Sequence, residues 1–327
     1  CNYFEGIVEN FSLKGSLLYW KLSSDAFQYL SVKKVQPTDT ATVLLAEQKM
    51  EKIDFSWDKA FRVGLGFDIP CACIETNVSW THYYTDNHEH VRVNGAAVPF
   101  TESFNLLQLP QIAASVPAGQ NADFVTGGRL RYDTIDLDFG RWCSCTDCFR
   151  LKPFAGFRFA EIADKLDSTF AFSAAFAPDL LLSGVYKASN SFHGAGVRGG
   201  VEFEYGIWCN LSVIGKGAAS YAWGRNHARL SFTGVRTDGT DPAAVTKKSD
   251  NTGRAFFEGS IGLRYTSEIL GCYPLIFEAL WEQNYLINAY QYLVDTSVTS
   301  VGSSNSASWK REDMMLSGLT ASVAIQF

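Results

Sequence analysis

The strongest constraint in this sequence is a two-residue alternation of apolar and polar side chains. In the segment 57–68, apolar side chains from Trp57 to Phe67 share one face, and small or charged side chains share the other. The same alternation recurs in four further segments: 192–207, 255–266, 273–285 and 315–327. Successive side chains of a strand point to opposite faces, so the pattern predicts an all-β protein.

The spacing of the strands narrows this fold class. Five more segments fit strands, which brings the expected number to ten: 11–34, 73–84, 128–142, 149–163 and 210–235. Long tracts, 36–56, 85–127, 164–191, 236–252 and 291–312, alternate with very short turns at 69–72, 143–148, 208–209 and 268–272. Outer-membrane barrels have this layout, with short periplasmic turns and long external loops. We predict one closed antiparallel transmembrane β-barrel over residues 1–327, with about ten strands and a range of ten to fourteen. A further strand pair within 164–191 would give twelve.

A soluble β-sandwich or β-propeller would show the same alternation. Aromatic residues near the strand ends favour the membrane, because such rings form interfacial girdles: Trp20, Trp57, Tyr84, Trp142, Trp208, Trp223 and Trp281. No run of apolar residues is long enough for a transmembrane helix. The formal net charge of -6 argues against nucleic acid as a partner, since phosphate binding needs a basic surface.

The alternation changes phase in the segment 128–142. Apolar residues are even-numbered up to Tyr132 and odd-numbered from Ile135 onward. A β-bulge near Asp133 would produce that change. We therefore expect Arg129 and Arg131 to face the lumen together with the even-numbered acids that follow the bulge.

Charged residues of the polar face are expected to line the interior of the barrel. A charge that faces lipid at the midplane would cost about 2–4 kcal/mol, whereas charges inside can pair across strands. The expected set is Arg62, Arg129, Arg131, Asp136, Asp138, Arg158, Arg198, Glu202, Glu204, Glu258, Arg264, Glu278 and Glu282. Such charges can create the field of a conducting pore. They can also fill a narrow barrel, because ten strands are close to the size at which side chains pack the interior.

The cysteines are concentrated in the short turns. Seven fall in these turns or directly beside them, and Cys1 joins them if the amino terminus lies at the same rim: Cys1, Cys71, Cys73, Cys143, Cys145, Cys148, Cys209 and Cys272. Eight cysteines fit an oxidising compartment, and we expect a mature chain whose export signal has been removed. Disulfides in the periplasm are the first interpretation. A thiolate metal site and free thiols are the alternatives, and Cys1 is a possible lipid anchor.

No catalytic or cofactor motif is present. The sequence contains no G-x-S-x-G, P-loop or dinucleotide fingerprint. His82, His88 and His90 lie near Asp86 and Glu89 in a region that we expect to be a solvated external loop, without a nucleophile beside them. We therefore expect no enzymatic activity, no metal and no cofactor.

Nine stretches, in this order, carry a resemblance to a known family: LLYWKLSSDAFQYL (17–30), WDKAFRVGLGFDI (57–69), VSWTHYY (78–84), YDTIDLDFGR (132–141), LKPFAGFRFAEI (151–162), FHGAGVRGGVEF (192–203), IGLRYTSE (261–268), FEALWEQNYL (277–286) and SGLTASVAIQF (317–327). Together they resemble the major outer membrane protein family of Legionella type, which also occurs among chlamydia-related bacteria. The resemblance spans nearly the whole chain and implies an abundant porin-like barrel of the bacterial outer membrane, with no agreed catalytic motif. The cysteines in the turns are more numerous than the resemblance to Legionella members implies. In this respect the chain is more similar to chlamydial proteins, which cross-link the envelope through disulfides.

The expected function is passive diffusion of small hydrophilic solutes through the charged lumen, with disulfides at the periplasmic rim that stiffen the envelope. The alternative is a structural or adhesive surface protein whose barrel does not conduct. Expected partners are outer-membrane lipid, further copies of the chain and disulfide-linked envelope proteins.

Overall fold

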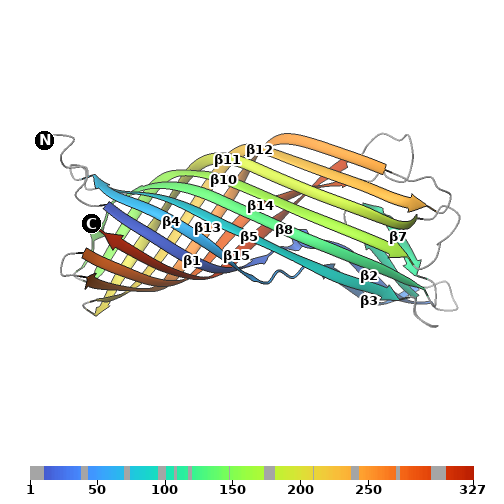
Figure 1. Ribbon diagram of the computed structural model, residues 1–327, viewed down its shortest axis with the longest axis horizontal. Helices are drawn as coiled ribbons and strands as arrows, with labels where there is room; N and C mark the ends of the chain where they lie inside the picture. Colours follow the sequence, from blue (N-terminus) through green and yellow to red (C-terminus); the bar gives the residue numbers. More distant parts are fainter. Residues whose placement is uncertain are drawn as a thin grey trace.

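A computed structural model describes residues 11–37, 43–69, 74–94, 101–106, 109–116, 120–146, 148–172, 181–208, 210–236, 243–269, 273–295 and 307–327. No helix among these residues is long and apolar enough to cross a membrane. The first and last described residues, Phe11 and Phe327, are joined by a backbone hydrogen bond and lie at one end of an elongated molecule, which we call the turn end (Figure 1). The opposite end is called the far end.

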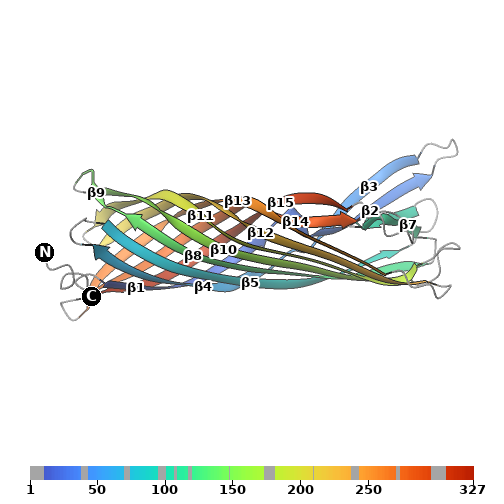
Figure 2. The same ribbon diagram turned by 90° about the horizontal axis from the view of Figure 1, so that it is seen from above.

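Ten long strands form a closed antiparallel barrel, as predicted. They are β1 (Phe11–Ser23), β4 (Trp57–Ile69), β5 (Ile74–Asn94), β8 (Asn121–Gly140), β10 (Phe149–Phe172), β11 (Leu181–Trp208), β12 (Leu211–Arg236), β13 (Ala243–Ile269), β14 (Tyr273–Asp295) and β15 (Ala307–Gln326). The first and last of them, β1 and β15, pair with each other, and the pairing of β10 with β11 completes the ring. A two-residue strand, β9 (Cys143–Ser144), pairs with β10 at the turn end (Figure 2).

A second sheet lies at the far end of the barrel (Figures 1 and 2). Its order is β3-β2-β6-β7, formed by β2 (Gln28–Pro37), β3 (Val43–Lys52), β6 (Thr101–Leu106) and β7 (Leu109–Val116). The expected single strand over 11–34 is therefore wrong. A short 3-10 helix, η1 (Asp25–Phe27), ends β1, because the side-chain oxygen of Ser24 accepts a hydrogen bond from the backbone N–H of Ala26.

The strands are much longer than a membrane requires, which corrects the predicted long loops. β10 has 24 residues and β11 has 28, whereas a tilted transmembrane strand needs about ten. The tract 164–191 does not add a strand pair to the ring. Its described residues extend β10 and β11, which stay paired as far as Ala171 and Ser183.

The predicted bulge near Asp133 is also wrong. β8 pairs with β5 and with β10 in unbroken register through Asp133. Even-numbered side chains of β8 face the interior along its whole length, from Phe124 to Asp138. The phase change reflects a change of surroundings: beyond Asp133, toward the far end, the interior becomes apolar and the exterior becomes polar.

The same inversion occurs on the neighbouring strand β10. Near the turn end, Phe157 and Phe159 are exposed on the outside, while Arg158 is buried inside. Toward the far end, Leu166 is buried inside and Lys165 points outward. The apolar exterior band of each strand marks the segment that contacts lipid. The strands therefore continue well beyond the membrane on the far side.

Candidate functional site: the barrel interior

A charged layer fills the interior at the level of the apolar exterior band. Arg158 on β10 forms a bidentate salt bridge with Asp136 on β8, in which Nε donates to Oδ1 at 2.6 Å and Nη2 donates to Oδ2 at 2.5 Å. It also pairs with Glu258 on β13, three strands away around the ring. Arg198 on β11 contacts both acids, at 3.2 Å from Asp136 and 2.8 Å from Glu258. The side chains of Arg158 and Arg198 are each only 2% exposed.

A second cluster lies closer to the turn end. Arg264 on β13 reaches Glu202 at 3.2 Å, Glu204 at 2.5 Å and Glu278 at 2.8 Å. Lys14 on β1 pairs with the same Glu278. Because these strands are not all neighbours in the ring, the contacts join opposite parts of the wall through the interior.

Arg62 and Glu282 form the third cluster. Nη1 and Nη2 of Arg62 on β4 donate to the two carboxylate oxygens of Glu282 on β14, at 2.9 and 3.1 Å. The Arg62 guanidinium carbon lies 5.7 Å from the centre of a Trp20 ring, a distance suited to a cation–π contact. Trp20 is fully buried inside the barrel, so its predicted place in the exterior aromatic girdle is wrong. It is even-numbered, like the other inward residues of β1.

Little empty space is left within the charged layer. The cavity there has a volume of about 130 Å³, room for on the order of ten water molecules. Its charged lining is nearly balanced, with six cations and five acids: Lys14, Arg62, Arg158, Arg198, Lys216 and Arg264, against Asp136, Glu202, Glu258, Glu278 and Glu282. A balanced network of this kind can cross-link the wall, and it lacks the single-sign ring that would select ions by charge.

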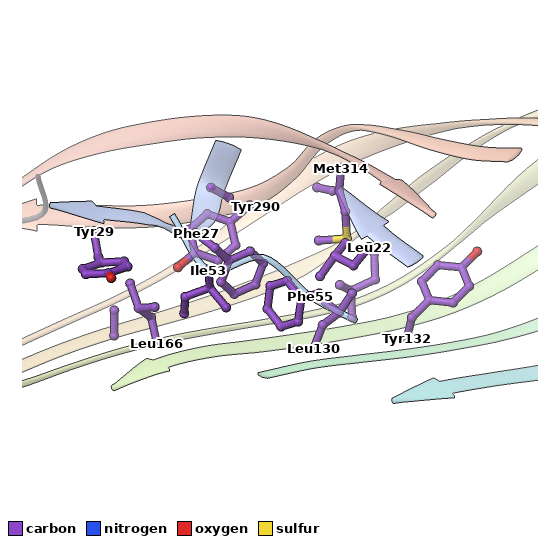
Figure 3. Close-up of a cluster of buried hydrophobic side chains, with 14 of the residues drawn as sticks. Leu22, Phe27, Tyr29, Ile53, Phe55, Leu130, Tyr132, Leu166, Tyr290 and Met314 are labelled. Atoms are coloured by element: carbon purple, nitrogen blue, oxygen red, sulfur yellow. The ribbon is translucent and has the colours of Figure 1, made fainter. Parts of the chain in front are cut away.

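Beyond the charged layer, a cluster of buried apolar side chains occupies the interior (Figure 3). Phe27, from η1, packs edge-on against Phe55 with ring centres 4.8 Å apart, and it lies 5.5 Å from the Tyr290 ring on β14. It also covers Gly128 on β8, where an added Cβ would lie 3.1 Å from the Phe27 ring. β8 and β14 are five strands apart in a ring of ten. Phe27 therefore bridges opposite walls.

The segments before β2 and before β4 supply this filling. The backbone N–H of Ile53 donates to the carbonyl of Phe27 at 3.2 Å, which ties the two segments together inside the barrel. Ile53 and Phe55 are almost completely buried. Burial also raises the pKa of the nearby Tyr29 hydroxyl.

Most of the predicted lumen residues lie inside the barrel. The structure brings together Arg62, Asp136, Asp138, Arg158, Arg198, Glu202, Glu204, Glu258, Arg264, Glu278 and Glu282. Arg129 and Arg131 do not join them, because without a bulge their odd numbers place them on the outside. Arg131 pairs there with Asp133 at 2.6 Å and with Glu161 at 3.3 Å.

Several interior residues were not singled out from the sequence. Lys152 bridges Glu75 and Glu202 at 3.1 and 3.0 Å, and Lys216 reaches Asp138 at 3.6 Å. Both lysines are even-numbered on β10 and β12, so the parity of their strands was a usable signal. The apolar plug residues Phe27 and Phe55 follow no strand alternation and carried no such signal.

The described cysteines lie at the turn end. Cys143, Cys145 and Cys148 are exposed free thiols on the β8–β10 connection that includes β9 (Figure 2). The other five candidates, Cys1, Cys71, Cys73, Cys209 and Cys272, lie outside the described residues. Disulfide formation therefore stays a prediction.

All three histidines lie on one strand: His82 falls within the expected strand 73–84, whereas His88 and His90 were expected in an external loop. His82, His88 and His90 belong to β5 and point outward. His82 Nδ1 lies 2.7 Å from Asp133, and His90 Nε2 lies 3.4 Å from Asp123. Within the described part of the chain, no group of three or more His, Cys, Asp or Glu side chains is arranged to hold a metal ion.

Comparison with solved structures returns other outer-membrane proteins. The outer membrane protease OmpT from Escherichia coli is 12% identical, with a TM-score of 0.41 and coverage of 98% of this chain and 97% of that one. A Pseudomonas aeruginosa FadL homologue is 8% identical, with a TM-score of 0.29 and coverage of 98% and 90%. No curated protein matches the chain.

The family comparison covers almost the whole sequence. A family model described as the Legionella pneumophila major outer membrane protein precursor matches residues 7–327. The matched range includes every strand of the closed barrel. The chain therefore belongs to this family and is a protein of the bacterial outer membrane.

Proposed function

We propose that this protein is a structural barrel of the outer-membrane surface whose lumen does not conduct. The observation that carries this proposal is the filled interior. Phe27 touches opposite walls beyond the membrane, and Arg158 and Arg198 are almost completely buried at membrane level. A hydrated solute would have to displace both layers in order to pass.

The interior contacts suit a mechanical role. Each arginine of the charged layer contacts acids on other strands, so the network holds the barrel in one shape. Removing one partner of such a pair leaves a buried charge without compensation, which is strongly destabilising. An abundant surface protein gains from this rigidity, because a stiff barrel resists deformation of the membrane around it.

The cysteines extend this role to the envelope. Three exposed thiols lie together at the turn end, which we place on the periplasmic side, where disulfides are stable. We propose that they form disulfides with other turns, with further copies of the chain or with envelope proteins. A non-reducing gel of whole envelopes tests this: higher-mass species that collapse on reduction are expected. Unchanged migration and unchanged mass would exclude it.

Passive diffusion of small hydrophilic solutes is the second candidate. The observation in its favour is the polar cavity within the charged layer, lined by groups such as Lys14, Arg62 and Glu258. For this function, the ion pairs and the Phe27 plug would both have to move aside. The two candidates therefore differ in whether the folded barrel opens.

Single-channel recording in planar bilayers separates them. Folded protein, verified by its heat-modifiable migration on gels, is expected to give no stable conductance steps. Steps from the wild type would reject the closed barrel. In that case, Arg158→Gln should change the step size or ion preference, whereas Arg129→Gln, a change on the outside of the barrel, should not.

A further inference from the structure

A row of basic side chains crosses the outside of the barrel. Strand pairing places Arg129 opposite Lys165, Lys165 opposite Ser189, Ser189 opposite Arg229, and Arg229 opposite Lys247. All five are odd-numbered on strands whose even-numbered side chains face inward. Four cations therefore lie on one continuous outer face formed by β8, β10, β11, β12 and β13.

These side chains line a depression in the outer surface. Its volume is about 690 Å³. The basic lining consists of Arg129, Arg131, Lys165, Arg229, Lys247 and Lys248. The one acid of the lining, Asp164, is buried and hydrogen-bonds Asn190 at 2.9 Å, so it points to the interior. The depression therefore carries an excess of positive charge, although Arg131 is paired with Asp133 and Glu161 at its edge.

The charges in this row are only partly compensated. Asp167 lies 2.8 Å from Lys165 and 4.0 Å from Arg129. Arg229 and Lys247 stand directly opposite each other, and neither forms an ion pair with a described residue. Like charges directly opposite on a sheet destabilise it. A bound anion between them would remove this repulsion.

The position of the row identifies the kind of anion. The continuous apolar band on the outside of these strands ends at residues such as Ile135, Phe159 and Trp223, and farther along only isolated apolar side chains such as Val125 and Val235 are exposed. Arg129, Lys165 and Arg229 lie six residues farther along the same strands. At about 3.3 Å per residue and a strand tilt of about 40°, the basic row therefore lies roughly 15 Å above the lipid-contacting band, with an aromatic girdle below it. Long Arg and Lys side chains can reach down to headgroups at this level.

We propose that this outer face binds the phosphorylated headgroup of an outer-leaflet glycolipid. Arg129 and Arg229 can donate bidentate hydrogen bonds to phosphate oxygens, and Lys165 and Lys247 add point charges. The acyl chains would lie on the apolar band below, against Phe159 and Trp223. The site lies on the lipid-facing side of the wall, so it goes beyond the proposed role of the lumen.

Native mass spectrometry of the folded full chain in a neutral detergent tests the proposal. The probe is bisphosphorylated lipid A, compared with the same lipid after dephosphorylation and with inorganic phosphate as a competitor. The variant is Arg229→Gln/Lys247→Gln, which removes the two cations that lack described partners. The control is Lys59→Gln, an exposed lysine on β4, five strands from β12 in the ring.

Wild-type protein should bind the bisphosphorylated lipid and should prefer it to the dephosphorylated form. The double variant should bind it about thirtyfold more weakly, since two cations near a charged surface are removed, and Lys59→Gln should bind like the wild type. Equal binding of both lipids, or equal binding by wild type and double variant, would overturn the proposal. Complete displacement by an equal concentration of inorganic phosphate would also overturn it, because the site would then hold a free anion and not a lipid.

Discussion

The two halves of the barrel are built from the same strands but have opposite polarity. In the membrane half, the exterior is apolar and the interior holds ion pairs such as Arg158–Asp136. In the far half, the exterior carries charges such as Arg131, and the interior holds Leu130 and Phe27. Side-chain parity does not change between them. The comparison shows that strand parity fixes which way a side chain points, while the surrounding solvent decides which residues suit each side.

The interior of the membrane half should be the most sensitive to mutation. Arg158→Met leaves Asp136 and Glu258 buried with less compensation, and we expect a loss of about 3–5 kcal/mol in the free energy of unfolding. Urea unfolding in lipid vesicles, followed by tryptophan fluorescence, measures it. Arg129→Met serves as the control, because Arg129 lies on the outside and its side chain is 48% exposed, and exposed pairs contribute about 0.2–1 kcal/mol. Equal losses in the two variants would show that the charged layer is solvated.

The interior of the far half should respond as an ordinary apolar core. Phe27→Ala should lower the free energy of unfolding by about 3 kcal/mol, because it opens a cavity between opposite walls. The same vesicle assay measures it. Phe159→Ala on the lipid face is the matched control, since lipid chains can fill the space that it leaves. If Phe27→Ala changed stability no more than this control, Phe27 would not bridge the walls.

The exteriors of the two halves should differ in their tolerance of charge. Ile261→Arg places a cation on the lipid face and should cost about 2–3 kcal/mol. Val125→Arg makes a similar change on the outer face of the far half. Water solvates the new charge there, so the free energy of unfolding should be almost unchanged. The two side chains are similarly exposed, at 57% and 48%. Similar losses in the free energy of unfolding at both sites would contradict the conclusion that lipid contacts only the membrane half.

The smallest effect is expected from a surface ion pair of the far half. Arg92 donates to Asp123 at 2.6 Å at the end of β8 farthest from the membrane, and this hydrogen bond lowers the pKa of Asp123. Its stabilisation is present at neutral pH and is lost as the pH falls through the lowered pKa. Arg92→Gln should therefore lower stability slightly at pH 7 and have no effect in acid. A loss that persisted in acid would point to packing and not to charge.

Much of the barrel could be predicted from the sequence, because alternation is local information. The ten strands and the inward direction of Arg62, Arg198 and Glu258 follow from parity alone. The phase change at Asp133 was misinterpreted as a bulge, since the prediction assumed that the exterior is apolar along the whole strand. That assumption put Arg129 and Arg131 on the wrong side.

The apolar plug was beyond sequence reasoning for a different reason. Phe27 and Phe55 lie in short segments between strands, where no periodicity indicates direction. Their position inside the barrel depends on contacts with Gly128 and Tyr290, which are distant in the sequence, the nearest of these pairs being Phe55 and Gly128. Trp20 was mispredicted for another reason. An aromatic residue near a strand end is typical of the exterior girdle, but Trp20 is even-numbered, and the even-numbered side chains of β1 point inward.

Spin-label accessibility along β8 tests the account most directly. In a background with all eight cysteines replaced by serine, single labels at successive positions from 123 to 139 are compared for collision with oxygen and with a water-soluble nickel complex. The account predicts oxygen access at odd positions from 135 onward, nickel access at odd positions up to 133, and access to neither reagent at even positions. Nickel access at even positions such as 136 and 138 would mean a water-filled lumen and would contradict the closed interior.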